Sequence, residues 1–150
     1  AGKFVMSNAP GWLSEWNIIC DPEAAAIAYD NAPQDMRSIG LDVTMQCQLD
    51  AGEVRDRFTA AGGPLLPTLD MAEVWFRHAP LMTFHDPLAA AAIFEPDICT
   101  WAKGNVKVEL RGEHTPGVTV FGGDENGRHE VAVAVDRERF FAHYFDVLSS

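Results

Sequence analysis

The sequence predicts an α/β fold: a mixed, mainly parallel sheet with flanking helices and an antiparallel hairpin region. Up to residue 94, short apolar segments alternate with helical ones, which is typical of a parallel sheet. Beyond residue 104 the pattern becomes strand, turn, strand, and Asn126-Gly127 is a strong signal for a tight turn. We therefore expect residues 1–150 to form a single domain or half-domain.

Composition agrees with a globular domain and excludes several classes of protein. Of the 150 residues, 47% are hydrophobic and 22% charged, which is enough for a sizeable core. No apolar run approaches membrane-spanning length, so we expect no membrane association. A net charge of -11 without a basic cluster argues against binding to nucleic acid. Three cysteines without metal-like spacing predict free thiols in a reducing compartment, and hence a cytoplasmic protein.

The first part of the chain alternates predicted strands and helices. The apolar segment 3–7 predicts a buried strand, and residues 38–43 predict a second one. Asp21 followed by Pro22 predicts the start of a helix, since a side-chain acceptor and a proline both suit the unpaired amides of a first turn.

Two further helices follow in the sequence. Asp50 with Glu53 three residues later forms a capping-box pattern, and Gly62 predicts the end of that helix. Residues 67–80 predict another helix that ends at Pro80. Its apolar positions are Leu69, Ala72 and Phe76, and we expect Trp75 and Phe76 to lie in the core rather than to act as a stacking platform.

The segment TFHDPLAAAAIFEP (83–96) contains the alanine-rich helix predicted from Asp86 to Phe94. Capping alone explains Asp86, but it does not explain why His85 stands directly before it. Two interpretations of Asp86 therefore remain, a helix cap and a ligand. The four other histidines are scattered, and we expect them at the surface or at an edge: His78, His114, His129 and His143.

The end of the chain predicts an amphipathic helix. The segment DRERFFAHYFDVL (136–148) places its apolar residues on one side. Its expected inner face consists of Phe140, Phe141, Tyr144, Phe145 and Leu148.

Four segments together resemble the inosine-uridine preferring nucleoside hydrolases. They are SEWNIICDPEAA, GLDVT, HDPLAAA and VKVELRGEHTPGVTVF…VAVAVDRERFF, and they occur in the family's order with roughly its spacing. The resemblance is to the C-terminal half of that family's chain. The family's Asp-x-Asp-x-x-x-Asp-Asp cluster, which supplies most calcium ligands and the water-activating aspartate, does not occur in this sequence.

The resemblance implies roles for five residues. Asp86 matches the calcium ligand of the family's His-Asp-Pro motif, and His85 matches the group that protonates the leaving nucleobase. Glu15 and Asn17 match residues that hydrogen-bond ribose hydroxyls. Asn8 is the nearest candidate for a further ribose-binding asparagine, in a segment where the family's Met-Gly-Gly reads Met6-Ser7-Asn8.

These residue types suit the cleavage of an N-glycosidic bond. The departing base must take a proton, which an imidazole near neutrality can supply. Hard cations such as Ca2+ favour carboxylates and hydroxyls, so a calcium ion can hold ribose and water together. Glu15 and Asn17, two positions apart, would point the same way in an extended segment.

The resemblance implies that this chain is part of a calcium-dependent nucleoside hydrolase. Such an enzyme converts ribonucleosides or deoxyribonucleosides to base and sugar in purine and pyrimidine salvage. We expect the chain to need a complementary N-terminal half or second subunit, and the assembled unit to be a homo-oligomer. The alternative is a non-catalytic module that binds a ribosyl ligand or a protein partner.

Overall fold

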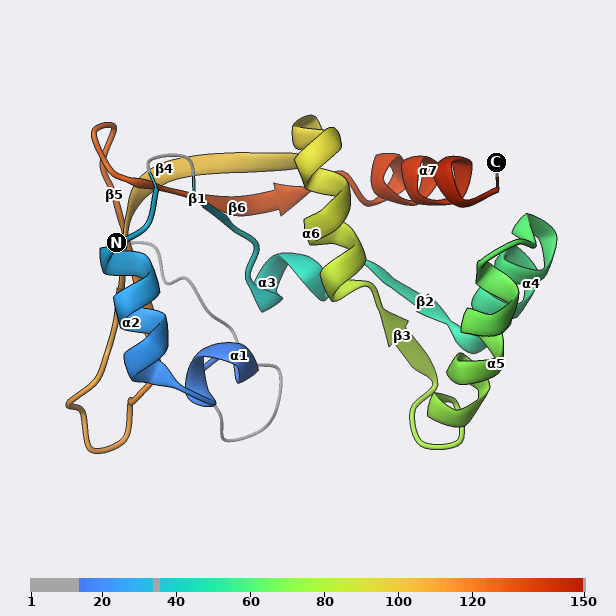
Figure 1. Cartoon of the computed structure of the whole chain (residues 1–150), viewed down its shortest axis with the longest axis horizontal. Coiled ribbons are helices and arrows are strands. Elements are labelled where there is room, and N and C mark those ends of the chain that lie inside the picture. The colour runs from blue at the N-terminus through green and yellow to red at the C-terminus, as the bar shows by residue number, and fades with distance from the viewer. Residues whose placement is uncertain (1–13, 34–35, 150) are drawn as a thin grey trace. The chain divides into compact units, whose positions relative to one another are not determined.

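The computed structural model describes residues 14–33 and 36–149, which form two compact units (Figure 1). Unit 1 contains the described residues of Ala1–Val43 and Cys99–Ala134. Unit 2 contains those of Thr44–Ile98 and Val135–Ser150.

Unit 1 is built on a four-stranded mixed sheet in the order β1-β6-β4-β5. Strand β1 runs parallel to β6, and β4 is antiparallel to β5, with Val106 opposite Phe121. The predicted α/β class, with a mixed sheet, helices and an antiparallel hairpin region, is confirmed. The strands in chain order are β1 (Met36–Ser38), β4 (Cys99–Val108), β5 (Thr119–Gly123) and β6 (His129–Val135).

Helix α2 packs on this sheet, next to the short helix α1. Asp21 begins α2 as predicted, because its Oδ1 accepts a hydrogen bond from the Ala24 amide at 2.9 Å. The core between α2 and the sheet consists of Tyr29 from the helix and Val106, Phe121 and Val131 from the strands. The helices span Trp16–Ile19 (α1), Pro22–Asp30 (α2) and Leu41–Thr44 (α3), the last of which leads into unit 2.

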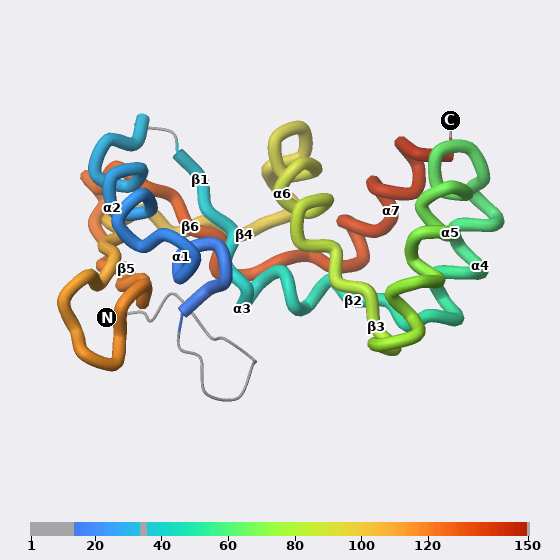
Figure 2. The backbone as a smooth tube through the Cα atoms, turned by 60° about the horizontal axis from the view of Figure 1, so that its bottom comes forward, coloured from blue at the N-terminus to red at the C-terminus, as the bar shows by residue number. Residues whose placement is uncertain are grey.

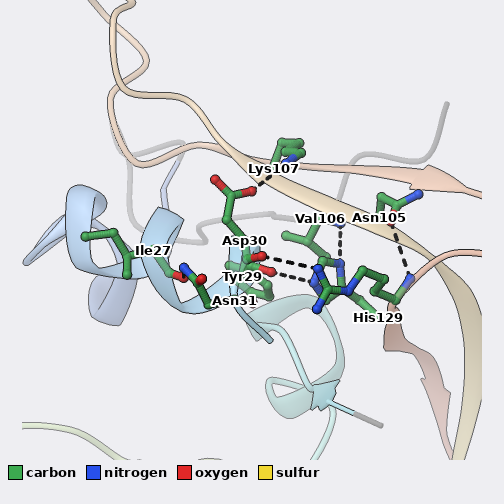
Figure 3. Close-up of polar contacts among 9 residues, drawn as sticks. Ile27, Tyr29, Asp30, Asn31, Asn105, Val106, Lys107 and His129 are labelled. Carbon is green, nitrogen blue, oxygen red and sulfur yellow. Dashed lines mark hydrogen bonds and ion pairs between the residues drawn. The ribbon is translucent and has the colours of Figure 1, made fainter. Parts of the chain in front are cut away.

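The C-terminal end of α2 and the residues after it are held by Arg128 and by His129, the first residue of β6 (Figure 3 shows the contacts of His129). His129 accepts a hydrogen bond from the Val106 amide at Nδ1, so its Nε2 carries the hydrogen donated to the Tyr29 carbonyl; both distances are 2.9 Å. Arg128 donates to the Ala32 carbonyl at 2.7 Å. His129 is only 4% exposed, so its predicted surface or edge position is wrong. Its ring is buried because it supplies hydrogen-bond partners to the Val106 amide and the Tyr29 carbonyl.

Unit 2 combines a two-stranded antiparallel sheet with four longer helices (Figure 2). Strand β2 pairs with β3 so that Leu49 lies opposite Met82. In chain order the elements are β2 (Gln48–Asp50), α4 (Ala51–Ala61), α5 (Leu65–Trp75), β3 (Leu81–Thr83), α6 (His85–Phe94), a 3-10 turn (Pro96–Ile98) and α7 (Arg137–Leu148).

Local sequence signals account for most helix ends of unit 2. Asp50 accepts a hydrogen bond from the Glu53 amide at 2.9 Å and so begins α4, as predicted. Gly62 follows the last residue of α4 with φ 71°, a conformation that favours glycine. Asp136 caps α7 in the same way through the Arg139 amide, at 3.0 Å.

An aromatic cluster forms the core of unit 2, with Phe84 at its centre. Phe84 is 2% exposed and precedes α6 directly. Edge-to-face packing of such rings adds to the free energy of burying them. The ring centroids around Phe84 are those of Phe141 at 5.1 Å, Tyr144 at 5.3 Å, Phe140 at 6.2 Å and Phe58 at 6.4 Å.

Two predicted features of the fold are wrong, and one lies outside the described residues. The expected strand 38–43 ends at Ser38, because the chain turns into α3 at Leu41. Residues 126–127 do turn, but they form no hairpin between β5 and β6, because β4 lies between those strands. The segment between β5 and β6 instead passes over β4. It passes so closely that a Cβ at Gly127 would lie 2.2 Å from the Gly104 carbonyl oxygen, which leaves room for glycine alone. The predicted strand 3–7 lies outside the described residues.

Candidate functional site

The predicted site residues fall into both units. Glu15 and Asn17 belong to unit 1, whereas His85 and Asp86 belong to unit 2. Each pair is described within its own unit. Asn8 lies outside the described residues, so its predicted contact with ribose stays a prediction.

Glu15 stands immediately before α1 and is half-buried. Its own backbone is extended, but its carbonyl accepts from the amides of Ile18 and Ile19 at 3.1 and 2.9 Å, which turns the chain at once into a helix. Asn17 therefore lies inside α1 and is exposed, and the extended arrangement predicted for the two side chains is wrong. The chain forms a helical turn here instead of an extended segment because the Glu15 carbonyl can accept local backbone hydrogen bonds.

The loop before β5 fixes α1 in position. The Ser14 hydroxyl donates to the Pro116 carbonyl at 3.0 Å. Gly117, at φ 78°, packs so closely that a Cβ there would lie 3.2 Å from the Ile19 Cα. Glu15 is thus presented by a short helix that two long-range contacts hold against the sheet unit.

Asp42 is an acidic neighbour of Glu15, and it lies in the segment GLDVT, to which the resemblance assigned no site residue. Burial raises the pKa of the Glu15 carboxyl, and the Asp42 charge raises that pKa further. Burial raises the pKa of Asp42 as well, against hydrogen bonds from the amides of Asp42 and Val43. Asp42 lies in the first turn of α3. Two carboxyl groups that resist ionisation therefore share one region of unit 1.

Replacing Glu15 with Gln is expected to raise the thermal unfolding midpoint at pH 7. The pKa of Glu15 is higher in the folded protein than in the unfolded chain, so folding favours the protonated carboxyl. This contribution to the free energy of unfolding is complete at a pH below the pKa of the unfolded chain. It is lost as the pH rises through the pKa of the folded protein. The amide carries no charge to desolvate, so the gain should nearly vanish at about pH 4. Differential scanning calorimetry at both pH values measures this. The matched control is Glu125→Gln in an exposed turn, and an equal gain there would contradict the explanation.

His85 and Asp86 are the first two residues of α6. The residue before the helix is Phe84, which provides no side-chain cap, so the interpretation of Asp86 as the N-cap is wrong. Pro87 is tolerated at the third helical position because its missing amide would have no helical partner there. Asp86 is exposed, and within the described residues its carboxylate accepts no hydrogen bond and forms no ion pair. A carboxylate in a first turn is also favoured by the helix dipole.

His85 is half-buried and held by a residue distant in sequence. Its Nδ1 lies 2.7 Å from Oγ1 of Thr44 at the end of α3. Burial lowers the pKa of the imidazole, which the Asp86 charge partly offsets. No described residue hydrogen-bonds its Nε2. One ring nitrogen is therefore anchored and the other is available.

A pocket of about 290 Å³ lies beside His85, lined by Trp75, Met82, Thr83 and His85. The Trp75 indole donates to the Leu81 carbonyl at 2.8 Å, which orients its ring. Trp75 is 54% exposed, so its predicted core position is wrong. Trp75 is the last residue of α5, so the helical periodicity that predicted a core position stops at this residue. An aromatic ring and a titratable imidazole share one small cavity.

The described residues do not by themselves complete a metal site. They contain no group of three or more His, Cys, Asp or Glu side chains arranged to hold an ion. Calcium takes about six to eight oxygen ligands, and Asp86 offers only its own carboxylate. That carboxylate fits a single position in such a site.

In the described part of the chain, no helix is both long and apolar enough to cross a membrane.

Comparison with known proteins gives a consistent result. Residues 2–142 match the family described as inosine-uridine preferring nucleoside hydrolase. The inosine-uridine preferring nucleoside hydrolase of Leishmania major is 32% identical over 145 residues, which cover 91% of this chain and 46% of that protein. The pyrimidine-specific ribonucleoside hydrolase RihA of Enterobacter sp. (strain 638) is 38% identical over 118 residues, 71% of this chain and 36% of that protein.

Solved structures agree with the sequence matches. The purine-preferring ribonucleoside hydrolase from Gardnerella vaginalis superposes with a TM-score of 0.69 at 29% identity, over 91% of this chain and 46% of that one. The chain thus spans about half the length of the relatives it matches, or less. A match over nearly the whole sequence, together with His85 and Asp86 at the start of one helix, shows that the chain belongs to the inosine-uridine preferring nucleoside hydrolase family.

Proposed function

We propose that this chain supplies the leaving-group side of a calcium-dependent nucleoside hydrolase and works with a complementary half that carries the remaining acids. The observation that carries the proposal is His85, which lines a pocket with Trp75 and stands beside the exposed carboxylate of Asp86. Family membership and the substrates named for the relatives support nucleosides as the substrate class.

The proposed reaction assigns this chain the transfer of one proton. As the bond between the sugar C1' and the base nitrogen breaks, its electron pair leaves with the base. His85, protonated at both ring nitrogens, gives its Nε2 proton to that base, which removes the developing negative charge, and becomes a neutral imidazole that keeps its hydrogen on Nδ1. A water oxygen bonds to C1' from the other side, and its proton goes to a carboxylate of the complementary half. Glu15 and Asn17 bind the ribose hydroxyls, and Asp86 is one calcium ligand.

The test is to reconstitute the missing part. The chain is co-expressed with the portion of the Leishmania major relative that it does not cover, and base release from inosine and uridine is measured. We expect turnover by the assembly and none by either piece alone. Turnover by this chain alone would overturn the need for a complementary half. An assembly that binds nucleosides without ever releasing base would favour the non-catalytic module instead.

Asp86→Asn is expected to raise the calcium concentration for half-maximal activity by about 10- to 100-fold, because a neutral amide is a weaker ligand for a hard cation. Activity is measured in chelator-buffered calcium. The matched control is Asp97→Asn, an exposed acid in the 3-10 turn of the same unit, which should leave the calcium dependence unchanged. An assembly indifferent to chelator, or an unshifted Asp86→Asn titration, would remove Asp86 from the metal site.

A further inference from the structure

Thr44 is a buried polar residue to which the proposed reaction assigns no role. It ends α3 and is 4% exposed. Its hydroxyl lies 2.7 Å from Nδ1 of His85, although 41 positions separate the two residues in sequence. Within the described residues this is the hydrogen bond that the Thr44 side chain makes.

Main-chain bonds hold the same two segments together independently of that side chain. The Phe84 amide donates to the Cys47 carbonyl, and the Cys47 amide donates to the Thr44 carbonyl, both at 2.9 Å. Cys47 and Phe84 are 0% and 2% exposed, so these bonds are shielded from water. These main-chain hydrogen bonds therefore place the Thr44 hydroxyl next to His85, and they do not depend on the Thr44 side chain.

The contact has a chemical consequence for the ring. An imidazole without a partner turns easily about χ2, which would present either face or either nitrogen to a ligand. A hydroxyl can donate to Nδ1 or accept from it, so the bond forms with either ring tautomer. With Nδ1 occupied, Nε2 is the nitrogen left for a ligand in the adjoining pocket.

We propose that Thr44 is a positioning residue that orients His85 so that Nε2 meets the leaving base. The proposal rests on the proposed function, since it concerns the same reaction. Thr44 acts through His85 and touches no substrate. Its effect is specific to substrates whose base leaves poorly without a proton, such as natural nucleosides. A riboside with a leaving group that is stable as an anion does not need it.

The experiment compares two substrates in the reconstituted assembly, inosine and 4-nitrophenyl riboside. We expect Thr44→Val to lower kcat for inosine about tenfold while KM stays within about twofold, because orientation is lost but binding is not. The rate on 4-nitrophenyl riboside should stay within about twofold, since nitrophenolate leaves unprotonated. Thr44→Ser keeps the hydroxyl and should restore the inosine kcat to within about threefold.

A spectroscopic measurement reads the contact itself. The 15N resonance of His85 Nδ1, assigned by its loss in His85→Gln, is recorded in the assembly at one fixed pH. We expect Thr44→Val to move it toward the value of an imidazole without a partner, and Thr44→Ser to leave it in place. The matched control is Thr68→Val in the same unit, where the hydroxyl bonds the Pro64 carbonyl. That substitution should change neither the resonance nor the rates.

The outcomes separate the two proposals. A wild-type inosine kcat in Thr44→Val, an equal loss on both substrates, or an unmoved Nδ1 resonance overturns the role of Thr44 and leaves the proposed function standing. A wild-type assembly that releases no base overturns the proposed function, and the positioning role with it. The selective loss on inosine with rescue by serine supports both.

Discussion

Replacing His85 with Gln is expected to slow inosine hydrolysis by the reconstituted assembly by about 10²- to 10⁴-fold, the usual contribution of a general acid. The amide can still hydrogen-bond Thr44 and fill the space beside Trp75, but it has no proton to give at neutral pH. The measurement is kcat for inosine and for 4-nitrophenyl riboside with the same enzyme preparation. The second substrate should lose little, because its leaving group needs no proton.

The matched control for this prediction is His78→Gln. His78 is exposed and belongs to the same unit, outside the residues that line the pocket. It should keep the wild-type rate on both substrates. If His85→Gln lost both activities equally, the defect would lie in folding or binding rather than in proton transfer. If it lost neither, another group would be the acid.

Phe84→Ala is expected to destabilise unit 2 by about 3–5 kcal/mol, the usual cost of removing a fully buried phenylalanine. The ring is 2% exposed and its neighbours come from α4 and α7, so the cavity would open between elements distant in sequence. Because Phe84 precedes His85 directly, the start of α6 would lose its anchor as well. Urea denaturation followed by circular dichroism measures the free energy of unfolding.

The same helix offers a matched control for the stability prediction. Phe94, at the other end of α6, is 77% exposed, so Phe94→Ala should change the free energy of unfolding by no more than about 0.5 kcal/mol. A loss below about 1 kcal/mol in Phe84→Ala would show that the aromatic cluster can close over the missing ring. It would then not be the feature that holds α6 in place.

Helix starts that depend on neighbouring residues were predicted correctly from sequence. Asp21 and Asp50 cap their helices because acceptor and amide are three residues apart, a distance that needs no tertiary structure. Asp86 has the same pattern, yet α6 begins one residue earlier. Phe84 occupies the cap position there, and its ring is buried among rings from other elements.

Strands and turns were predicted less well. Strands β2 and β3 have three residues each, too few for an alternating pattern, and they exist because they pair with each other. The turn at Asn126-Gly127 forms, but its local geometry could not say which strand the chain would join next. Sheet order is a long-range property, and here β4 took the place beside β6.

For the site, the sequence by itself determined that an imidazole and a carboxylate stand together at the start of a helix, since they are adjacent in the chain. Only the tertiary structure decided that Asp86 is not the cap, that Trp75 lines the pocket beside His85, and that burial, and then the charge of Asp42, raise the pKa of Glu15. It also decided the partner of His85, Thr44, 41 positions away. The physical reason is that capping acts within one helical turn, whereas burial, charge and side-chain hydrogen bonds act between segments that only folding brings together.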